Sequence, residues 1–214
     1  MVDPRLYCTH CHACMATDTN ICSKWELLGL SSNDGDGYSE YAAINEDMCY
    51  VRPDSEPLSE AALIEHLTVA RHAARSSGFN DYQDKTILIL SGGPVGLAAI
   101  ICAGSKRRGK LIVSVPTTKR PQQTAQFVDA VLDPRKEKVL KDGMDALRRG
   151  GTYVNCRRLG GRRFYTAQDF KETVDDWIAG KFKGLGDVVT KGLEKLVNNK
   201  DDHVKILVTP PGTL

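Results

Sequence analysis

The sequence lacks the features that mark membrane, secreted and polyanion-binding proteins. No apolar run in its 214 residues approaches the length of a membrane span. No secretory segment precedes the first cysteines, so we expect a cytoplasmic protein in which the seven cysteines stay reduced and metal binding is favoured over disulfides. Basic residues number 29 and acidic residues 27, a balance that implies neither a nucleic acid nor a membrane surface as partner. These absences leave a compact soluble protein.

What the chain does have is a dense group of cysteines at its start. Cys8, Cys11, Cys14 and Cys22 follow the spacing C-x2-C-x2-C-x7-C. Four thiolates close a tetrahedral shell around zinc, and the intervening residues are small enough for the chain to curl around one ion. Two disulfides are the alternative, which the lack of a secretory segment disfavours. We therefore predict one structural zinc per chain and no second metal site.

The remaining cysteines and the apolar pattern predict the rest of the fold. We expect Cys49, Cys102 and Cys156 to be buried as small hydrophobic residues. Alternating strands and helices imply an α/β fold with a parallel sheet and right-handed crossovers. The expected strands cover 38–44, 86–90, 111–115, 130–132, 152–156 and 204–208. The expected helices cover 59–75 with Ser59 as N-cap, 97–105 with Gly109 ending it, 138–149, 169–179 and 188–197.

Several segments together resemble one family. They are the cysteine spacing, GDGYSEYAA at 35–43, LIEHLTV at 63–69, KTILILSGGPVG at 85–96 and NNKDDHVKILV at 198–208. This set resembles the medium-chain zinc-containing alcohol dehydrogenases, in their polyol and 2,3-butanediol dehydrogenase branch. The resemblance implies an abridged Rossmann-like parallel sheet plus a remnant of a GroES-like domain that carries a structural-zinc lobe. The expected parts are 1–57 for the lobe and remnant, 58–197 for the Rossmann-like domain and 198–214 for a segment returning to the first part.

The departures from that family shape the functional expectation. The family's catalytic zinc is held by a cysteine and a His-Glu pair upstream of the lobe, and this chain has no counterpart to them, so it resembles an N-terminally and internally shortened member. Our leading hypothesis is a repurposed, non-redox enzyme that isomerises, cyclises or eliminates a small organic molecule by acid/base chemistry. The alternatives are a reduced NADP(H)-dependent oxidoreductase of alcohols or ketones and a catalytically dead, zinc-stabilised binding protein.

The turn at 91–96 is the candidate cofactor site. In G-x-G-x-x-G, the second glycine lets a pyrophosphate approach and the third lets the helix pack on the strand. Gly93 and Gly96 hold those two positions, and Ser91 holds the first. Val115 stands where an acidic residue would bind the ribose, whereas Lys119 and Arg120 could meet a 2′-phosphate. NADP(H) is thus possible and NAD unlikely, and a purely structural turn is the alternative.

Candidate proton-handling residues lie on the helix expected at 59–75. Glu65 matches the family's glutamate at or beside the catalytic zinc, and His66 and His72 follow it. Adjacent residues on a helix point about 100° apart, so Glu65 and His66 would not chelate one ion well. We expect these three residues to act in acid/base catalysis, and the alternative is a surface ion pair with a core histidine.

Two further features concern the surface and the assembly. Six arginines cluster between residues 148 and 163, and we interpret them as a solvated face rather than an anion site. The strand expected at 152–156 lacks its neighbour in the family, and an uncovered strand edge favours pairing. We therefore expect a symmetric homodimer joined through the Rossmann-like half, with a small molecule as substrate and no nucleic-acid or membrane partner.

Overall fold

The computed structural model describes residues 1–30, 41–79, 82–90, 93–104, 109–114, 128–133, 140–156, 165–182, 185, 189–191 and 205–207. The chain forms two compact units. The first contains Met1–Glu65, Gly161–Ala179 and Gly184–Leu214, and the second contains His66–Gly160 and Gly180–Lys183. The domain boundaries that we expect from the sequence stay predictions.

The second unit is built on a four-stranded parallel sheet. Its strands are β3 (Thr86–Ile89), β4 (Lys110–Val113), β5 (Val128–Asp133) and β6 (Leu147–Asn155). They lie in the order β4-β3-β5-β6, and all three pairings are parallel. The chain therefore adds β4 on one side of β3 and β5 on the other, which is the strand reversal of a Rossmann-like sheet. The predicted fold class is confirmed.

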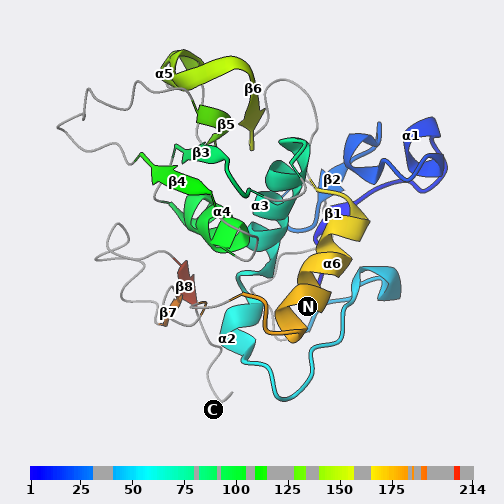
Figure 1. The fold of residues 1–214 in the computed structure, drawn as a ribbon. Coiled ribbons are helices and arrows are strands. Elements are labelled where there is room, and N and C mark those ends of the chain that lie inside the picture. The colour runs from blue at the N-terminus through cyan, green and yellow to red at the C-terminus, as the bar shows by residue number, and fades with distance from the viewer. Residues whose placement is uncertain are drawn as a thin grey trace. The chain divides into compact units, whose positions relative to one another are not determined.

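Helices cover both faces of this sheet because its strands are apolar on both faces. In Figure 1, α5 (Leu140–Ala146) lies on one side of the strands and α4 (Pro94–Gly104) on the other. Leu88, Leu90 and Val131 form a buried cluster with Ala146 of α5. Gly143 lets α5 come this close, since a Cβ there would lie 2.6 Å from the Tyr153 ring.

The opposite face of the sheet is equally apolar. Ile87, Ile89 and Leu132 are each at most 1% exposed. Within the same unit, α4 also contacts α3 (Ile64–Ser76), where the Cys102 thiol lies 3.5 Å from the Leu67 carbonyl oxygen. The small residues of α4, which the sequence showed as an apolar run after the glycine turn, permit this close approach.

The first unit contains short strands and helices. A two-stranded antiparallel sheet joins β1 (Arg5–Leu6) to β2 (Glu26–Leu27), and a two-stranded parallel sheet joins β7 (Val189–Lys191) to β8 (Lys205–Leu207). The remaining elements are α1 (His12–Met15), η1 (Thr19–Ile21), η2 (Glu46–Met48), α2 (Leu58–Ala61) and α6 (Ala167–Ile178).

Helix α6 anchors this unit, and its local sequence explains why it forms. Thr166 and Asp169 make a reciprocal capping box at its start. Its apolar stripe of Phe170, Val174 and Trp177 is buried, as the periodicity predicts. The Trp177 indole N–H donates to the Glu60 carboxylate at 3.0 Å, which ties α6 to α2.

Several expected boundaries are wrong. The helix expected from Ser59 begins at Leu58 after an N-cap at Pro57, and it breaks at 62–63 into α2 and α3. The helix expected to start at residue 97 already starts at Pro94. Gly109 directly precedes β4 rather than ending α4. The next residue, Lys110, already belongs to the sheet, since its backbone N–H donates to the Lys85 carbonyl.

Other differences reflect tertiary pairing that overrides local preference. The helix expected over 138–149 ends at Ala146, because Leu147 pairs with Val128 and begins β6. Residues 189–191, expected to be helical, form β7 by pairing with β8. Residues 41–44 are not a strand, and 38–40 lie outside the described residues. Within the described part of the chain, every helix is too short or too polar to span a bilayer.

Candidate functional site

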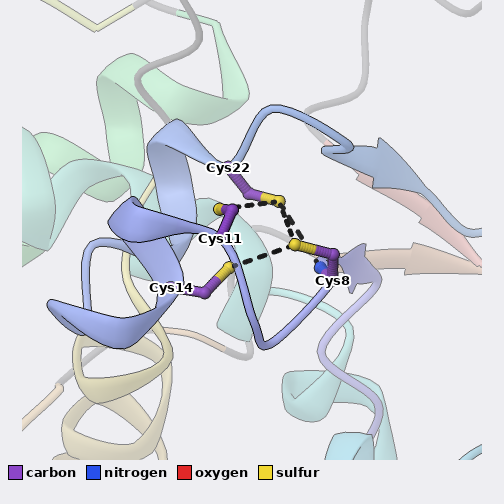
Figure 2. A group of neighbouring side chains, drawn as sticks. All are labelled: Cys8, Cys11, Cys14 and Cys22. Atoms are coloured by element: carbon purple, nitrogen blue, oxygen red, sulfur yellow. Dashed lines mark hydrogen bonds between the residues drawn. The ribbon is translucent and has the colours of Figure 1, made fainter.

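The four predicted cysteines converge on one point (Figure 2). The Cys8 and Cys22 sulfurs lie 3.6 Å apart, those of Cys8 and Cys14 4.0 Å, and those of Cys11 and Cys22 3.9 Å. A tetrahedral zinc with Zn–S bonds of about 2.3 Å holds its sulfurs about 3.8 Å apart. The donor set and its spacing therefore fit a closed structural zinc site.

Short helical turns place these thiols. Cys8 follows β1, Cys11 is the N-cap of α1, Cys14 lies within α1, and Cys22 ends η1. The chain reverses between them at Thr9 and Thr17, whose φ angles are 64° and 66°. The backbone N–H groups of Cys8 and Lys24 point at the Cys22 sulfur at 3.4 and 3.3 Å, an arrangement that suits a thiolate acceptor.

Backbone N–H groups lower the pKa of two of the four thiols, and burial raises the pKa of a third. The backbone N–H of Cys14, with that of Ser23, lowers the pKa of Cys11 to about 5. The backbone N–H of His10 lowers the pKa of Cys8. Burial raises the pKa of the Cys14 thiol to about 12, so we expect this thiol to lose its proton only when a metal replaces it. Zinc at this site would supply folding free energy rather than an open coordination position.

A buried arginine joins the cysteine lobe to the start of α6 within the first unit. Arg5 is 1% exposed and binds the Asp3 carboxylate through Nε and Nη2. Its Nη1 donates to the Tyr165 carbonyl at 2.7 Å and to the Thr19 hydroxyl at 3.3 Å, and its guanidinium lies 4.6 Å from the centre of the Tyr165 ring. Sequence reasoning missed this residue, because an arginine in a strand of two residues gives no sign of burial.

The glycine turn lies where the strand order reverses. Gly93 precedes α4 and its carbonyl accepts the Leu97 N–H at 2.9 Å, and Gly96 is buried in the first turn of α4. A helix N-terminus beside the carboxyl end of β3 is the position at which Rossmann-like sheets bind a pyrophosphate. Ser91, Val115, Lys119 and Arg120 lie outside the described residues, so the expectations that rest on them stay predictions.

The three candidate proton-handling residues all lie on α3. Glu65 is in its first turn, His66 follows, and His72 is nearly two turns further along. Each is partly buried. The structure thus confirms that a helix carries them, while their catalytic roles stay predictions.

The remaining expectations for single residues are confirmed in part. Cys102 is buried and Cys156 partly buried, but Cys49 is exposed because it ends the surface turn η2. Arg148 binds Asp129 at 2.6 Å and Arg149 is exposed, both at the amino end of β6. This is the sheet edge opposite the glycine turn. The other four arginines lie outside the described residues.

One pair at the carboxyl edge of the sheet was also missed. The Tyr153 hydroxyl of β6 donates to the Asp133 carboxylate, which ends β5 and is 0% exposed. The sequence does carry a signal for Asp133, namely an acidic residue directly after the buried run Ala130-Val131-Leu132. Its partner is invisible from the sequence, because their contact depends on the register of two strands.

Comparisons with known proteins bear on this geometry. No family model matches the chain. Among curated proteins, it is 27% identical to a probable diacetyl reductase of Saccharomyces cerevisiae and 26% identical to the (R,R)-butanediol dehydrogenase of that yeast. Both matches cover 94% of this chain, with 62% and 67% of the relatives. It is 34% identical to the sorbitol dehydrogenase of Bacillus subtilis over 113 residues, which are 53% of this chain and 31% of that enzyme.

Solved structures show the same fold. An alcohol dehydrogenase of Escherichia coli CFT073 complexed with NADH superposes with a TM-score of 0.81, at 17% identity over 97% of this chain and 75% of that one. A zinc-binding dehydrogenase of Sinorhizobium meliloti bound to NADP gives 0.80, at 18% identity over 98% and 76%. The 2R,3R-butanediol dehydrogenase of Bacillus subtilis gives 0.76, at 21% identity over 98% and 73%.

Along nearly its whole length the chain is similar to a diacetyl reductase and a butanediol dehydrogenase, and it spans only part of theirs. The resemblance drawn from its motifs is thereby confirmed, and it spans about 62% of the length of the diacetyl reductase. The hypothesis of a non-redox enzyme is wrong. Its relatives along nearly the whole chain are reductases and dehydrogenases, which are oxidoreductases.

Proposed function

We propose that this protein is an NAD(P)(H)-dependent oxidoreductase that interconverts secondary alcohols and ketones. The observation that carries the proposal is homology along 94% of the chain to proteins named as a diacetyl reductase and a butanediol dehydrogenase. The parallel sheet and the glycine turn after β3 support it, because this is the fold that positions a dinucleotide. In the reaction, the ketone takes a hydride from the reduced nicotinamide and a proton from the protein, and it leaves as the alcohol.

The substrate class that we propose is a vicinal diol or an α-oxygenated ketone. Diacetyl, butanediol and sorbitol, which name the relatives, all carry oxygen on adjacent carbons. The first test mixes the full-length, zinc-loaded protein with diacetyl and either NADPH or NADH, and it measures oxidation of the nucleotide as the loss of nicotinamide absorbance. The second test is the reverse reaction with 2,3-butanediol and sorbitol. Failure to oxidise or reduce either nucleotide with any of these compounds would contradict the proposal.

For the cofactor we propose NADP(H) rather than NAD(H). Val115 cannot accept a hydrogen bond from a ribose hydroxyl, and Lys119 and Arg120 follow at a spacing that suits a 2′-phosphate. We expect NAD⁺ to bind with a dissociation constant above about 1 mM. In calorimetric titrations, K119A/R120A should weaken NADPH binding and leave NADH binding unchanged. Micromolar binding of NAD⁺ would reverse the assignment.

For the metal and the proton we propose one structural zinc at the four cysteines and a proton donor on α3. General acid catalysis by a positioned side chain contributes roughly 10²–10⁴-fold. One of the variants Glu65→Gln, His66→Asn and His72→Asn should therefore lower kcat by at least about 100-fold, with zinc content and NADPH affinity unchanged. Elemental analysis that gives two equivalents of zinc would place the chemistry on a metal instead.

A further inference from the structure

The carboxyl edge of the parallel sheet carries a tyrosine whose hydroxyl is oriented by a buried acid. In the register of β5 and β6, Asp133 pairs with Asn155 and Val131 pairs with Tyr153. Side chains alternate along strands, so Tyr153, Asn155 and Asp133 share one face. The ring of Tyr153 packs against the apolar cluster under α5, and its hydroxyl reaches the Asp133 carboxylate at the end of β5.

This hydrogen bond fixes the polarity of the hydroxyl group. A tyrosine hydroxyl has a single proton to donate, and a carboxylate can only accept. With that proton given to Asp133, the Tyr153 oxygen can serve a ligand only as an acceptor. Tyr153 is partly exposed whereas Asp133 is fully buried, so Tyr153 is the member of this pair that a ligand can reach.

The position of this acceptor relative to the glycine turn indicates its ligand. Strand β5 lies directly beside β3, with the Leu90 N–H donating to the Leu132 carbonyl at 3.1 Å. Neighbouring strands are about 4.8 Å apart, so the end of β5 is one strand from the turn that follows β3. A Rossmann-like sheet binds one half of a dinucleotide on each side of this point. The adenosine half lies toward β4, and the nicotinamide half lies toward β5 and β6.

We propose that Tyr153, held by Asp133 as positioning residue, accepts a hydrogen bond from a hydroxyl group of the nicotinamide-side ribose. The inference rests on the proposed function, since it concerns the same cofactor. Tyr153 would then supply a ribose contact in the nicotinamide half of the site, for which the sequence analysis names no residue. Phosphate recognition stays with the turn at Gly93 and Gly96, which lies where the strand order reverses.

The experiment compares two nucleotides that differ in this ribose. Both nucleotides are used in the forms that carry a 2′-phosphate on the adenosine ribose, as the proposed NADP(H) site requires, and are called ADP and ADP-ribose below. The first has the adenosine ribose and the pyrophosphate, and the second adds the other ribose without nicotinamide. In calorimetric titrations of the full-length, zinc-loaded protein, Tyr153→Phe should weaken ADP-ribose about five-fold, the effect of losing one neutral hydrogen bond, and leave ADP unchanged. Tyr82→Phe is the matched control, because Tyr82 is a buried tyrosine that precedes the amino end of β3 in the same unit.

A second variant tests the positioning role of Asp133. Asp133→Asn should weaken ADP-ribose by no more than Tyr153→Phe does, because a neutral amide holds the tyrosine hydroxyl less firmly than the charge-assisted hydrogen bond to a carboxylate. The double variant should bind no more weakly than Tyr153→Phe alone, since Asp133 acts through Tyr153. Additive losses, or an equal loss of ADP affinity, would mean a structural role and overturn the proposal.

The wild-type titrations separate the two levels of failure. If the wild type prefers ADP-ribose over ADP but Tyr153→Phe does not change this preference, the ribose contact is refuted and the oxidoreductase proposal stands. The contact is also refuted if the wild type binds the two nucleotides equally. If it binds neither nucleotide, both proposals fall together.

Discussion

At the scale of single residues, the cysteine lobe shows how a metal-binding sequence accepts local strain. Thr9 and Thr17 adopt φ angles of 64° and 66°, a left-handed conformation that β-branched residues rarely take. The strain is about 1–2 kcal/mol for each residue. Hydrogen bonds stabilise both turns, from the Thr9 hydroxyl to the Cys8 carbonyl and from the Thr17 N–H to the Cys14 carbonyl. These turns let the four cysteines face a common centre.

Among the described glycines of the second unit, Gly109 has very little room for a side chain. A Cβ there would lie 2.0 Å from the Lys85 carbonyl oxygen and 2.4 Å from that of Tyr82, both backbone atoms that cannot rotate away. We predict that Gly109→Ala lowers the free energy of unfolding by at least about 3 kcal/mol, or prevents folding, since β3 and β4 must separate. Urea denaturation measures this. Gly78→Ala is the control, because its Cβ meets nothing within 4 Å and only its φ of 78° is unfavourable. Equal losses for the two variants would contradict the prediction.

Asp129 makes the stability of the sheet depend on pH. Burial alone would raise the pKa of this carboxyl, but the Thr86 N–H at 2.8 Å and the Arg148 guanidinium at 2.6 Å lower it below its ordinary value. A carboxyl with a lowered pKa stabilises the fold above its unfolded pKa of about 3.9, and this contribution disappears as the pH falls through the folded pKa.

We therefore predict that Asp129→Asn is less stable than the wild type at neutral pH and that the difference shrinks as the pH falls below about 4. Denaturation curves of both proteins between pH 7 and pH 3 measure the difference. Asp145→Asn, at an exposed position on α5, is the control and should leave the curve unchanged. A difference that is constant with pH would show that Asp129 acts through packing alone.

At the scale of elements, a helix or strand was predictable when the pattern that specifies it lies within its own segment of the sequence. Strand β3 and helix α6 were predictable, because an unbroken apolar run and a 3.6-residue apolar stripe are properties of the segments themselves. The end of α5 was not. Leu147, Arg148 and Arg149 are good helix formers, yet Leu147 pairs with Val128 and Arg148 with Asp129, contacts about twenty residues away.

The same distinction holds for the candidate sites. The zinc ligands were predictable because their spacing is short and only one kind of chemistry suits four such cysteines. Tyr153 and Asp133 were not, because neither residue is unusual alone and only strand register brings them together. Arg5 is a similar case, since its partner Tyr165 is 160 residues away in the sequence.

The zinc lobe gives the sharpest test at this scale. We predict one zinc per chain, and we predict that Cys11→Ser yields an insoluble or strongly destabilised protein, because structural zinc contributes folding free energy directly. Elemental analysis and thermal unfolding measure both effects. Cys49→Ser is the matched control in the same unit, since Cys49 is exposed and far in sequence from the four ligands. A wild-type protein without zinc, or a stable Cys11→Ser variant, would contradict the prediction.

At the scale of the whole molecule, the two terminal strands of the four-stranded sheet differ in a way that favours one of them for pairing. Strand β4 starts with the exposed Lys110, and a charge on an edge strand discourages association. Strand β6 is the other terminal strand, and its second half, Thr152-Tyr153-Val154-Asn155, carries no charge. The outer edge of a terminal strand forms a template for a second copy of the chain.

We propose that the protein is a symmetric homodimer in which β6 of one copy lies against β6 of the other, because a two-fold operator lets the same edge serve both subunits. Light scattering at micromolar concentration should give twice the monomer mass. Thr152→Lys places a charge on this strand and should shift the mass toward the monomer. The control is Met144→Lys, which adds the same charge at a position of α5 that is 52% exposed. A wild-type protein that scatters as a monomer would exclude the dimer. Equal dissociation of both variants would show that net charge, rather than the edge of β6, governs the association.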